Sequence, residues 1–339
     1  MPREIQSQES ALRVNETSSQ AACDDAAGDG RAVNLGDRLT AILEAGLTVP
    51  AATEIAAPFL PALSDPSRGV QAVVLYGSVL WKTVRGATSQ PDFIAIVDGL
   101  QSWSPRVRDR LWRAVLPPSV YCLRADGATA KVSVVTAGAL VAQTSGRARD
   151  LHLAGRLSKR VALVWARDAR ARAAVVEAQR AALMTTARLA LSRFDGPVAL
   201  DDFLRTLLGL SYESEIRIAE PGKVAALFEV ERAHYRAVGR ALLGALGATP
   251  VDVTATAFRL PDGVAASPSA TRRVLRRSRR RAFLRWPKYL ATYDGWLDYL
   301  LQKLARSGTP VILTDRQRRH PFIFALPVLF RMVRTGRVG

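Results

Sequence analysis

Apolar positions in the first part of the chain change between helical spacing and short continuous runs. Leu35–Leu47 carries apolar residues at helical spacing, whereas Val70–Tyr76 and Asp92–Val97 are short and almost wholly apolar, as buried strands are. Further on, the pattern predicts one helix and then two strands separated by a turn, at Arg106–Val115, Val120–Arg124 and Lys131–Thr136. We therefore expect an α/β fold with a mixed sheet and helices packed on it.

The middle of the chain is expected to be mainly helical. An Ala- and Arg-rich helix is predicted over Ala169–Ala190, and further helical segments follow it to about Gly247. The first 34 residues are rich in Ser, Gln, Ala, Asp and Gly, which is typical of a disordered tail. The predicted organisation is a tail at 1–34, an α/β domain at 35–165, a helical domain at 166–250 and a basic aromatic region at 251–339.

Composition limits the class of protein. A chain of 339 residues that is 48% hydrophobic is long enough for two folded units. Its two cysteines, Cys23 and Cys122, suggest neither a disulfide framework nor a zinc site, which favours a reducing compartment. The sequence contains no apolar run of about eighteen residues and begins with a polar segment of mixed charge. We therefore expect no transmembrane helix, signal peptide or transit peptide.

Candidate chemistry lies between the first two predicted strands. Gly77 lets the backbone approach a phosphate group closely, and Ser78 adds a hydroxyl and an N–H that bind phosphate oxygens, so Tyr76, Gly77 and Ser78 form a candidate phosphate-binding turn. Asp92 opens the next strand with a carboxylate, the type of ligand that Mg²⁺ takes together with substrate phosphates. The structural alternative is an ordinary turn between two core strands.

This arrangement resembles the nucleotidyltransferase superfamily, in which Gly-Ser precedes an Asp-x-Asp pair on the next strand. The present sequence has only the first acid, since Asp92 is followed by Phe93 and Ile94. Asp98 lies on the same face of the strand but roughly 20 Å further along, at about 3.3 Å per residue. Asp98 is nevertheless the candidate second metal ligand beside Asp92.

Four further motifs point to one family. They are Asp150-Leu-His-Leu-Ala-Gly-Arg-Leu-Ser-Lys-Arg-Val, Leu208-Gly-Leu-Ser-Tyr-Glu-Ser-Glu-Ile-Arg, Lys223-Val and Ala233-His-Tyr. In order and spacing they resemble the mitochondrial-type phosphatidate cytidylyltransferases, which are soluble CDP-diacylglycerol synthases also called mitochondrial translocator assembly and maintenance proteins. The resemblance covers roughly residues 70 to 245, and that family shares the strand that begins with Asp-Phe and ends with Val-Asp. We expect a bacterial member.

The resemblance implies a Mg²⁺-dependent transfer of CMP from CTP to phosphatidic acid, which yields CDP-diacylglycerol and pyrophosphate. Such a transfer depends on positioning and on neutralising charge, so it calls for converging Lys and Arg side chains. The resemblance gives this role to Arg156, Lys159 and Lys131, with Asp92 as metal ligand. Their structural alternative is a pair of basic residues at a helix end and a lysine at a strand edge, all facing solvent.

The resemblance also implies further nucleotide-binding residues and a second domain. Glu215 stands where the family carries an acid, Arg217 is two residues further on, and Lys223 begins the matching Lys-Val motif. For Glu215 and Arg217 the alternative is a surface ion pair. The family's helical domain is winged-helix-like, so the motifs at 155–159 and 211–223 are expected to flank a cleft between domains, where ligand sites tend to form.

Positive charge is concentrated at the C-terminal end. The formal net charge is +18, and residues 270–339 hold seventeen Lys and Arg against three Asp, a net of +14. The densest block comprises Arg272, Arg273, Arg276, Arg277, Arg279, Arg280 and Arg281. Such a block attracts polyanions, and each Lys or Arg near an anionic membrane surface contributes about 1 kcal/mol.

Aromatic residues next to this block favour a membrane over nucleic acid as partner. Trp286, Tyr289, Tyr293, Trp296 and Leu300 recur at steps of three and four residues along one helical face. Basic residues beside aromatic rings at this spacing are typical of a segment that lies in the membrane interface. We expect a cytoplasmic protein, peripheral on the inner face of the membrane, with CTP, phosphatidic acid and an anionic membrane surface as partners and without nucleic acid. The alternative is that the aromatic stripe packs into the protein's own core.

Two other functions fit the same residues. One is a nucleotidyltransferase that acts on RNA ends or a small acceptor, which would use the Gly-Ser turn and Asp92 equally well. The other is a catalytically inactive nucleic-acid or membrane-binding protein, because the second acid of the Asp-x-Asp pair is missing.

Overall fold

A five-stranded mixed sheet forms the centre of the molecule. The computed structural model describes residues 35–82, 90–103, 116–215, 222–293, 296–298, 301 and 313–320. The strands of the sheet are β1 (Val70–Tyr76), β2 (Asp92–Val97), β3 (Ser119–Ala125), β4 (Ala128–Thr136) and β5 (Val161–Ala166), in the order β3-β4-β2-β1-β5. β2 and β4 are parallel, and the other neighbouring pairs are antiparallel. The expected α/β class with a mixed sheet is confirmed, and β5 is a strand that the sequence pattern did not reveal.

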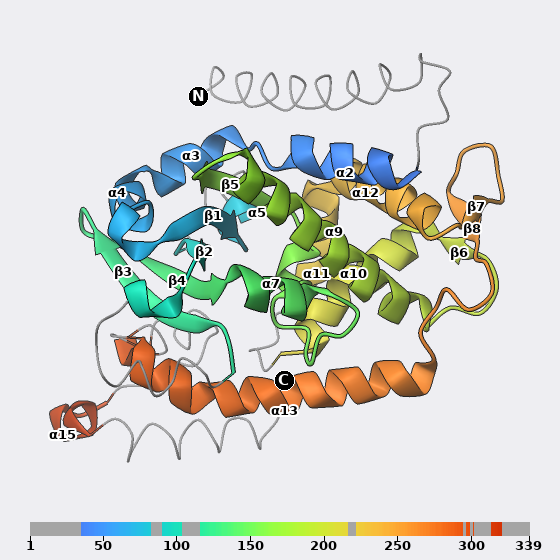
Figure 1. Ribbon diagram of the computed structural model, residues 1–339. Coiled ribbons are helices and arrows are strands. Elements are labelled where there is room, and N and C mark those ends of the chain that lie inside the picture. Colours follow the sequence, from blue (N-terminus) through green and yellow to red (C-terminus); the bar gives the residue numbers. More distant parts are fainter. Residues whose placement is uncertain are drawn as a thin grey trace, which may run out of the picture.

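The two faces of the sheet are covered by different helices. Alternate residues of a strand point to opposite faces, so Val73 and Leu75 pack with Phe93 on one side, while Val74 and Ile94 point to the other. The first face is covered by the segment that contains α3 (Pro50–Ala56), η2 (Ala57–Phe59), α4 (Leu60–Leu63), η3 (Pro66–Arg68) and, further on, η5 (Leu100–Ser102). The second face is covered by α2 (Leu35–Gly46), α7 (Ala137–Thr144), α8 (Ala154–Leu157) and α9 (Ala169–Leu191). Figure 1 shows α9 crossing this face as a long helix.

The helical part continues the core of the sheet. Asp168 caps α9 by accepting a hydrogen bond from the Ala171 N–H, which satisfies one of the free donors at the helix start. After α9, the helical part consists of α10 (Leu200–Glu213), α11 (Lys223–Val230), α12 (Arg232–Ala245) and a small sheet of β6 (Val198–Ala199), β8 (Ala257–Arg259) and β7 (Thr249–Pro250). One hydrophobic cluster runs from Val74 and Ile94 through α9 to Phe203 and Leu242. The predicted boundary between residues 165 and 166 therefore lies inside a continuous core.

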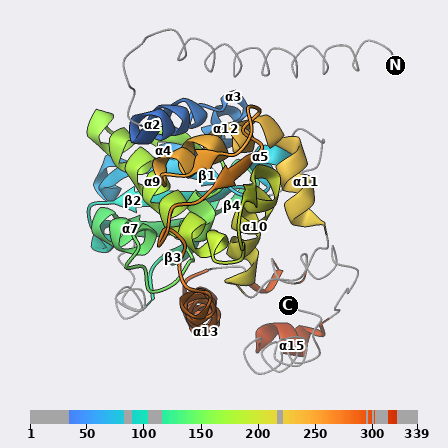
Figure 2. The same ribbon diagram turned by 90° about the vertical axis from the view of Figure 1, so that its right-hand side faces the viewer.

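The basic region begins with a 25-residue helix, α13 (Pro268–Thr292). Ser267 caps it by accepting from the Ala270 N–H, and Pro268 stands at the first position, where no N–H is needed. Figures 1 and 2 show α13 lying along one side of the molecule, where it packs beside β3. Two hydrogen bonds fix it along its length, between the hydroxyls of Thr271 and Ser192 at 2.8 Å and from the Leu151 N–H to the Ser278 hydroxyl at 3.1 Å.

The expected aromatic membrane stripe is wrong for Tyr293 and Trp296, which are buried. Tyr293 is 2% exposed and Trp296 is 7% exposed, and both pack on Val120 and Cys122 of β3. Tyr289 stacks on Tyr293 with ring centroids 4.9 Å apart. These rings cover an edge of the sheet because β3 presents apolar side chains that would otherwise face water. They are therefore part of the protein core.

Several predicted features lie outside the described residues. They are the tail at 1–34, the helix at 106–115, Arg217, Leu300 and the apolar run at 321–330; the side chain of Trp286 is likewise not described. The remaining elements that the structure describes are α5 (Val79–Lys82) and α15 (Asp315–Arg319). Within the described part of the chain, no single helix has both the length and the apolar composition to cross a bilayer, although the bent pair Gly36–Gly46 and Pro50–Leu63 has them together.

The first prediction concerns the contact between α8 and α10. A Cβ atom on Gly155 would lie 2.9 Å from the Ser211 Cβ and 3.1 Å from its Cα, so Gly155→Ala requires the two helices to move apart. Overpacking of this kind costs about 1–3 kcal/mol. We expect Gly155→Ala to lower the free energy of unfolding by that amount in urea denaturation.

Gly138 of α7 is the matched control for this substitution. It is also a helical glycine, but a Cβ there meets no atom within 4 Å, so Gly138→Ala should be neutral or slightly stabilising. Equal stability of the two variants would show that α8 and α10 are not in close contact.

Candidate functional site

A polar row crosses the sheet at the point where β1 ends and β2 begins. Tyr76 is paired with Asp92, Asp92 with Lys131, and Lys131 with Cys122. Paired residues of neighbouring strands point to the same face of a sheet, and here that face is the one covered by α8 and α9. The next residues on this face are Val74, Ile94, Ser133 and Val120, so apart from Ser133 the row borders a hydrophobic core.

The predicted phosphate-binding turn lies directly against Asp92. Gly77 has φ +91, and a Cβ atom on it would lie 3.3 Å from the Asp92 Oδ2. A side chain at this position would crowd the carboxylate as well as strain the backbone. Ser78 follows the glycine and is half-buried. The structure therefore brings Tyr76, Gly77, Ser78 and Asp92 together, as the sequence motif requires.

The carboxylate of Asp92 is the only predicted metal ligand at this turn. Its side chain is partly exposed, and Lys131 Nζ lies 3.7 Å from the Asp92 Oδ1. Among the described residues there is no group of three His, Cys, Asp or Glu side chains placed to hold a metal ion. Mg²⁺ is commonly held by one or two carboxylates together with substrate phosphates. One partly exposed carboxylate beside a glycine turn fits that ligand set.

Asp98 does not belong to this site, which corrects the expectation that it is a second metal ligand. It follows the far end of β2, where its carboxylate accepts hydrogen bonds from Gln71 at 2.6 Å and from Arg167 at 2.9 Å. These two bonds lower the pKa of Asp98. The carboxylate is thus used to join β1, β2 and the end of β5.

Arg156 is held rigidly beside the row. It donates a hydrogen bond to the Tyr76 hydroxyl at 3.2 Å, another to the His152 carbonyl at 2.6 Å and a third to the Glu215 carboxylate. Burial would lower the pKa of Arg156, but the charge of Glu215 and the contact with Tyr76 outweigh it and raise the pKa. Arg156 is therefore a fixed positive charge, and its electrostatic influence extends to Asp92.

The contact between the two most specific motifs explains this geometry. Gly155 packs against Ser211, so the Ala-Gly-Arg-Leu segment touches the Gly-Leu-Ser-Tyr segment of α10 directly. Glu215 follows the end of α10 and reaches back to Arg156. The motifs expected to flank a cleft are thus in contact, and Glu215 orients an arginine of the site.

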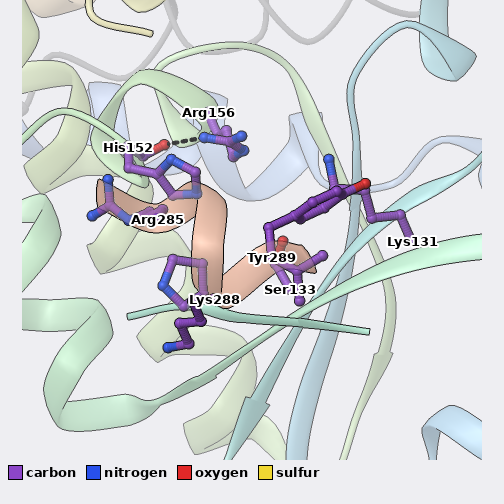
Figure 3. A pocket seen from close by; sticks show the side chains of 9 residues that line it. Lys131, Ser133, His152, Arg156, Arg285, Lys288 and Tyr289 are labelled. Carbon is purple, nitrogen blue, oxygen red and sulfur yellow. Dashed lines mark hydrogen bonds between the residues drawn. The ribbon is translucent and has the colours of Figure 1, made fainter. Parts of the chain in front are cut away.

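A small cavity of about 70 Å³ adjoins the row. Figure 3 shows that side chains from β4, from the segment around α8 and from α13 converge on it. Its lining consists of Pro118, Val120, Lys131, Ser133, His152, Arg156, Arg285, Lys288 and Tyr289. Two residues of the cavity, Lys131 and Arg156, were predicted as site residues.

Helix α13 supplies the part of this cavity that the sequence analysis missed. Arg285 donates hydrogen bonds to the Pro117 carbonyl at 3.1 Å and to the Asp150 carboxylate at 2.8 Å, and Lys288 donates to the Leu116 carbonyl at 3.3 Å. Arg281 also donates to Asp150, at 2.6 Å. Burial raises the pKa of Asp150, but the charges and hydrogen bonds of the two arginines outweigh it and lower the pKa.

A sequence signal for these residues existed but could not be interpreted alone. Asp150 and His152 stand at the start of the motif that contains Arg156, and Arg281, Arg285 and Lys288 recur at helical spacing. The spacing shows that the three cations share a helical face. Only the folded chain shows that this face meets Asp150 and β3.

His152 contributes a neutral side chain to the cavity. Its ring Nδ1 lies 3.4 Å from the Glu215 carboxylate. Burial lowers the pKa of His152 well below its ordinary value, and the charges of Arg156 and Arg285 lower it further. At neutral pH the ring is therefore uncharged and serves as a hydrogen-bonding group.

Lys159 and Lys223 do not line the cavity. Lys159 Nζ is 4.0 Å from the centroid of the Tyr212 ring. Lys223 begins α11 and is half-buried. The structure does not bring Lys223 into the row, and Arg217 lies outside the described residues.

Comparisons with known proteins give no family assignment. No protein-family model matches the chain, and no curated protein is significantly similar to it.

The second prediction concerns the pH dependence of stability through Lys288, which is 2% exposed. Burial, and then the charge of Arg285, lower the pKa of Lys288 to about 8. In the unfolded chain the lysine has its ordinary, higher pKa. At pH values between the two pKa values, the unfolded state binds more protons than the folded state, so the free energy of unfolding rises with pH. Relative to Lys288→Met, we expect the wild type to gain roughly 1–2 kcal/mol of unfolding free energy between about pH 8 and pH 9.5.

Urea denaturation at several pH values measures this difference. Lys223→Met is the control, because its side chain lies outside the cavity, and its difference from the wild type should not vary with pH in this way. A constant difference between the wild type and Lys288→Met would show that Lys288 keeps an ordinary pKa in the folded protein.

Proposed function

We propose that this protein is a phosphatidate cytidylyltransferase that transfers CMP from CTP to phosphatidic acid at a membrane surface. The observation that carries the proposal is the Asp92 carboxylate, which lies beside the Gly77 turn and in one row with Tyr76 and Lys131. The adjoining cationic cavity adds a place for a second phosphate group. The motifs around Arg156 and Glu215 support the substrate assignment by their resemblance.

The proposed reaction needs no nucleophile from the protein. A phosphate oxygen of phosphatidate forms a bond to the α-phosphorus of CTP, while the bond from that phosphorus to the oxygen shared with the β-phosphorus breaks. The electron pair leaves with pyrophosphate, and CDP-diacylglycerol is formed. Catalysis of such a step consists of positioning the two phosphates and neutralising their charges.

The residues of the row fit these two tasks. Gly77 and Ser78 would bind the triphosphate, and Asp92 would hold Mg²⁺ together with phosphate oxygens. When bound, Mg²⁺ supplies positive charge to the triphosphate oxygens and favours departure of pyrophosphate. Lys131 contacts Asp92 and Arg156 contacts Tyr76, so both would add positive charge beside the triphosphate, and Lys159 follows the end of α8.

We propose a nucleotidyltransferase-like architecture for the sheet with its covering helices. For the helical part, α10, α11 and α12 with the small sheet of β6, β8 and β7 correspond to a winged-helix-like unit. The helical part shares its core with the five-stranded sheet, and Gly155 contacts Ser211 of α10. Both observations support an arrangement in which the helical part orients site residues of the sheet and its covering helices.

The outer face of α13 supports membrane binding in place of the aromatic stripe. We define this outer face as the exposed residues Arg272, Arg273, Arg276, Arg280, Phe283 and Leu284. Phe283 is 49% exposed and Leu284 is 57% exposed, although both are large and apolar. Arginines beside exposed apolar side chains on one helical face favour an anionic membrane interface. We propose a peripheral location on the cytoplasmic face of the membrane.

The third prediction tests the metal ligand. Asp92→Ala should reduce the release of pyrophosphate from CTP, Mg²⁺ and phosphatidate by about a hundredfold or more, because the metal contributes several kcal/mol to this kind of transfer. Asp98→Asn should keep its activity, since Asp98 lies at the other end of β2. Formation of CDP-diacylglycerol is measured in parallel.

Other outcomes identify the rival functions. Wild type that consumes ATP with an RNA end or a small acceptor, and ignores phosphatidate, would be a different nucleotidyltransferase. A protein that binds nucleic acid with a steep salt dependence, and binds neither CTP nor liposomes, would be the inactive nucleic-acid-binding protein. This rival is favoured by the absence, among the described residues, of a second carboxylate beside Asp92.

The fourth prediction tests the outer face of α13. The double variant Phe283→Asp, Leu284→Asp should lose most of its binding to vesicles that contain phosphatidate, because it removes apolar contact and adds negative charge near an anionic surface. Vesicle co-sedimentation measures the bound fraction. Val253→Asp is the control, since Val253 is fully exposed elsewhere on the surface, and an equal loss in this control would contradict the assignment.

A further inference from the structure

The cavity of about 70 Å³ beside the polar row is lined on one side by residues of α13 that have no role in the proposed binding of CTP. Arg285, Lys288 and Tyr289 of α13 lie across from Lys131 and Ser133 of β4 (Figure 3). These residues are brought together although more than a hundred positions separate them in the chain. A helix whose outer face is rich in arginine thus carries cations on its inner face too.

The lining of the cavity is positively charged. Its four cations are Lys131, Arg156, Arg285 and Lys288, and among the nine described residues that line it none is acidic. Among the described residues, three carboxylates contact these cations from outside the lining: Asp92 contacts Lys131, Glu215 contacts Arg156, and Asp150 contacts Arg285. Asp150 in addition contacts Arg281. Within this described part of the chain, five cations thus face three carboxylates.

Two of these cations are buried, where the charged form of a side chain is unfavourable. Lys288 and Arg285 are almost wholly buried, and burial is the main reason why the pKa of each is lowered. Desolvation penalises the charged form of a side chain, and a nearby opposite charge favours it. An anion in the cavity would therefore stabilise both cations in their charged forms.

The size and walls of the cavity limit the anion. A single water needs about 10–15 Å³, so a volume of about 70 Å³ accommodates a phosphate-sized group. Pro118, Val120 and the ring of Tyr289 supply apolar wall. This combination suits a phosphate group that carries an apolar substituent.

The cavity lies beside the turn that is proposed to bind CTP, at a different position of the sheet. The turn and Asp92 lie at the end of β1 and the start of β2, whereas the cavity is lined from β3, β4, the segment around α8 and α13. β4 is two positions from β1 in the sheet, which corresponds to about 10 Å at roughly 4.8 Å between strands. Lys131 connects the two places, because it lines the cavity and contacts Asp92.

We propose that this cavity binds the phosphate of a phosphate monoester with an apolar substituent, and that Arg285 and Lys288 of α13 are ligands of that phosphate. The identification of this monoester as the acceptor rests on the proposed function, whereas binding itself does not. The outer face of α13 would bind the membrane while its inner face receives the phosphate of a lipid from that membrane.

The test measures binding of a short-chain, water-soluble phosphatidate to the full chain by titration calorimetry, in the absence of membranes. Lys288→Met should weaken this binding about tenfold, because a hydrogen bond to a charged group contributes about that factor or more. Binding of CTP with Mg²⁺ should stay within about twofold of the wild type. Short-chain diacylglycerol, which lacks the phosphate, should not bind, and inorganic phosphate should bind much more weakly than phosphatidate.

Arg280→Gln is the matched control. It removes one positive charge from the same helix, but Arg280 lies on the outer face and does not line the cavity. It should leave binding of the soluble phosphatidate unchanged. Equal weakening by Arg280→Gln and Lys288→Met would overturn the proposal, as would a variant Lys288→Met that loses CTP binding and keeps phosphatidate binding, or equal affinity for inorganic phosphate and phosphatidate.

A second measurement uses the wild type and so does not depend on folding of a variant. Amine acetylation followed by peptide mass spectrometry should show that short-chain phosphatidate protects Lys131, which lines the cavity and is partly exposed, several-fold relative to Lys223, which lies outside the cavity. Unchanged labelling of Lys131 would overturn the proposal. Phosphatidate binding through Lys288 without formation of CDP-diacylglycerol would leave this inference intact and refute the proposed cytidylyl transfer.

Discussion

The pairing of β2 with β1 on one side and with β4 on the other is the constraint on which the site depends. It places Asp92 between Tyr76 and Lys131, and it places all three side chains on the face that α8 and α9 cover. Strand pairing allows little freedom here, because a shift of one residue would turn Asp92 toward the opposite hydrophobic face. A carboxylate, a lysine and a tyrosine hydroxyl thus meet beside a glycine turn without any flexible loop among them.

Ion pairs then attach the other elements to this row. Glu215 and Tyr76 hold Arg156, which joins the helical part of the chain to the sheet. Asp150 holds Arg281 and Arg285, which joins α13 to the same region. Removing one partner of a buried pair leaves a charge without compensation and is strongly destabilising. The site and the packing of the C-terminal helix are therefore not independent of each other.

The two faces of α13 connect the proposed chemistry with the proposed location. The inner face is buried against β3 and carries Arg285, Lys288 and Tyr289, while the outer face exposes arginines together with Phe283 and Leu284. A lipid phosphate has to leave the membrane surface only as far as the thickness of one helix, about 10–12 Å, to reach such a cavity. The high positive charge of this region is thus divided between a membrane-facing role and a ligand-binding role.

The sequence by itself determined the local elements and the type of chemistry. The apolar runs of β1 and β2 are unbroken, and Gly77, Ser78 and Asp92 stand at strand ends, so period and residue type were enough to locate them. Tertiary structure alone decided which distant groups meet. It joined Asp98 to Gln71 and Arg167, buried Tyr293 and Trp296 against β3, and brought Arg285 and Lys288 into one cavity with Lys131. These outcomes depend on strand register and on the face that a helix turns inward, which follow from packing between segments far apart in the chain.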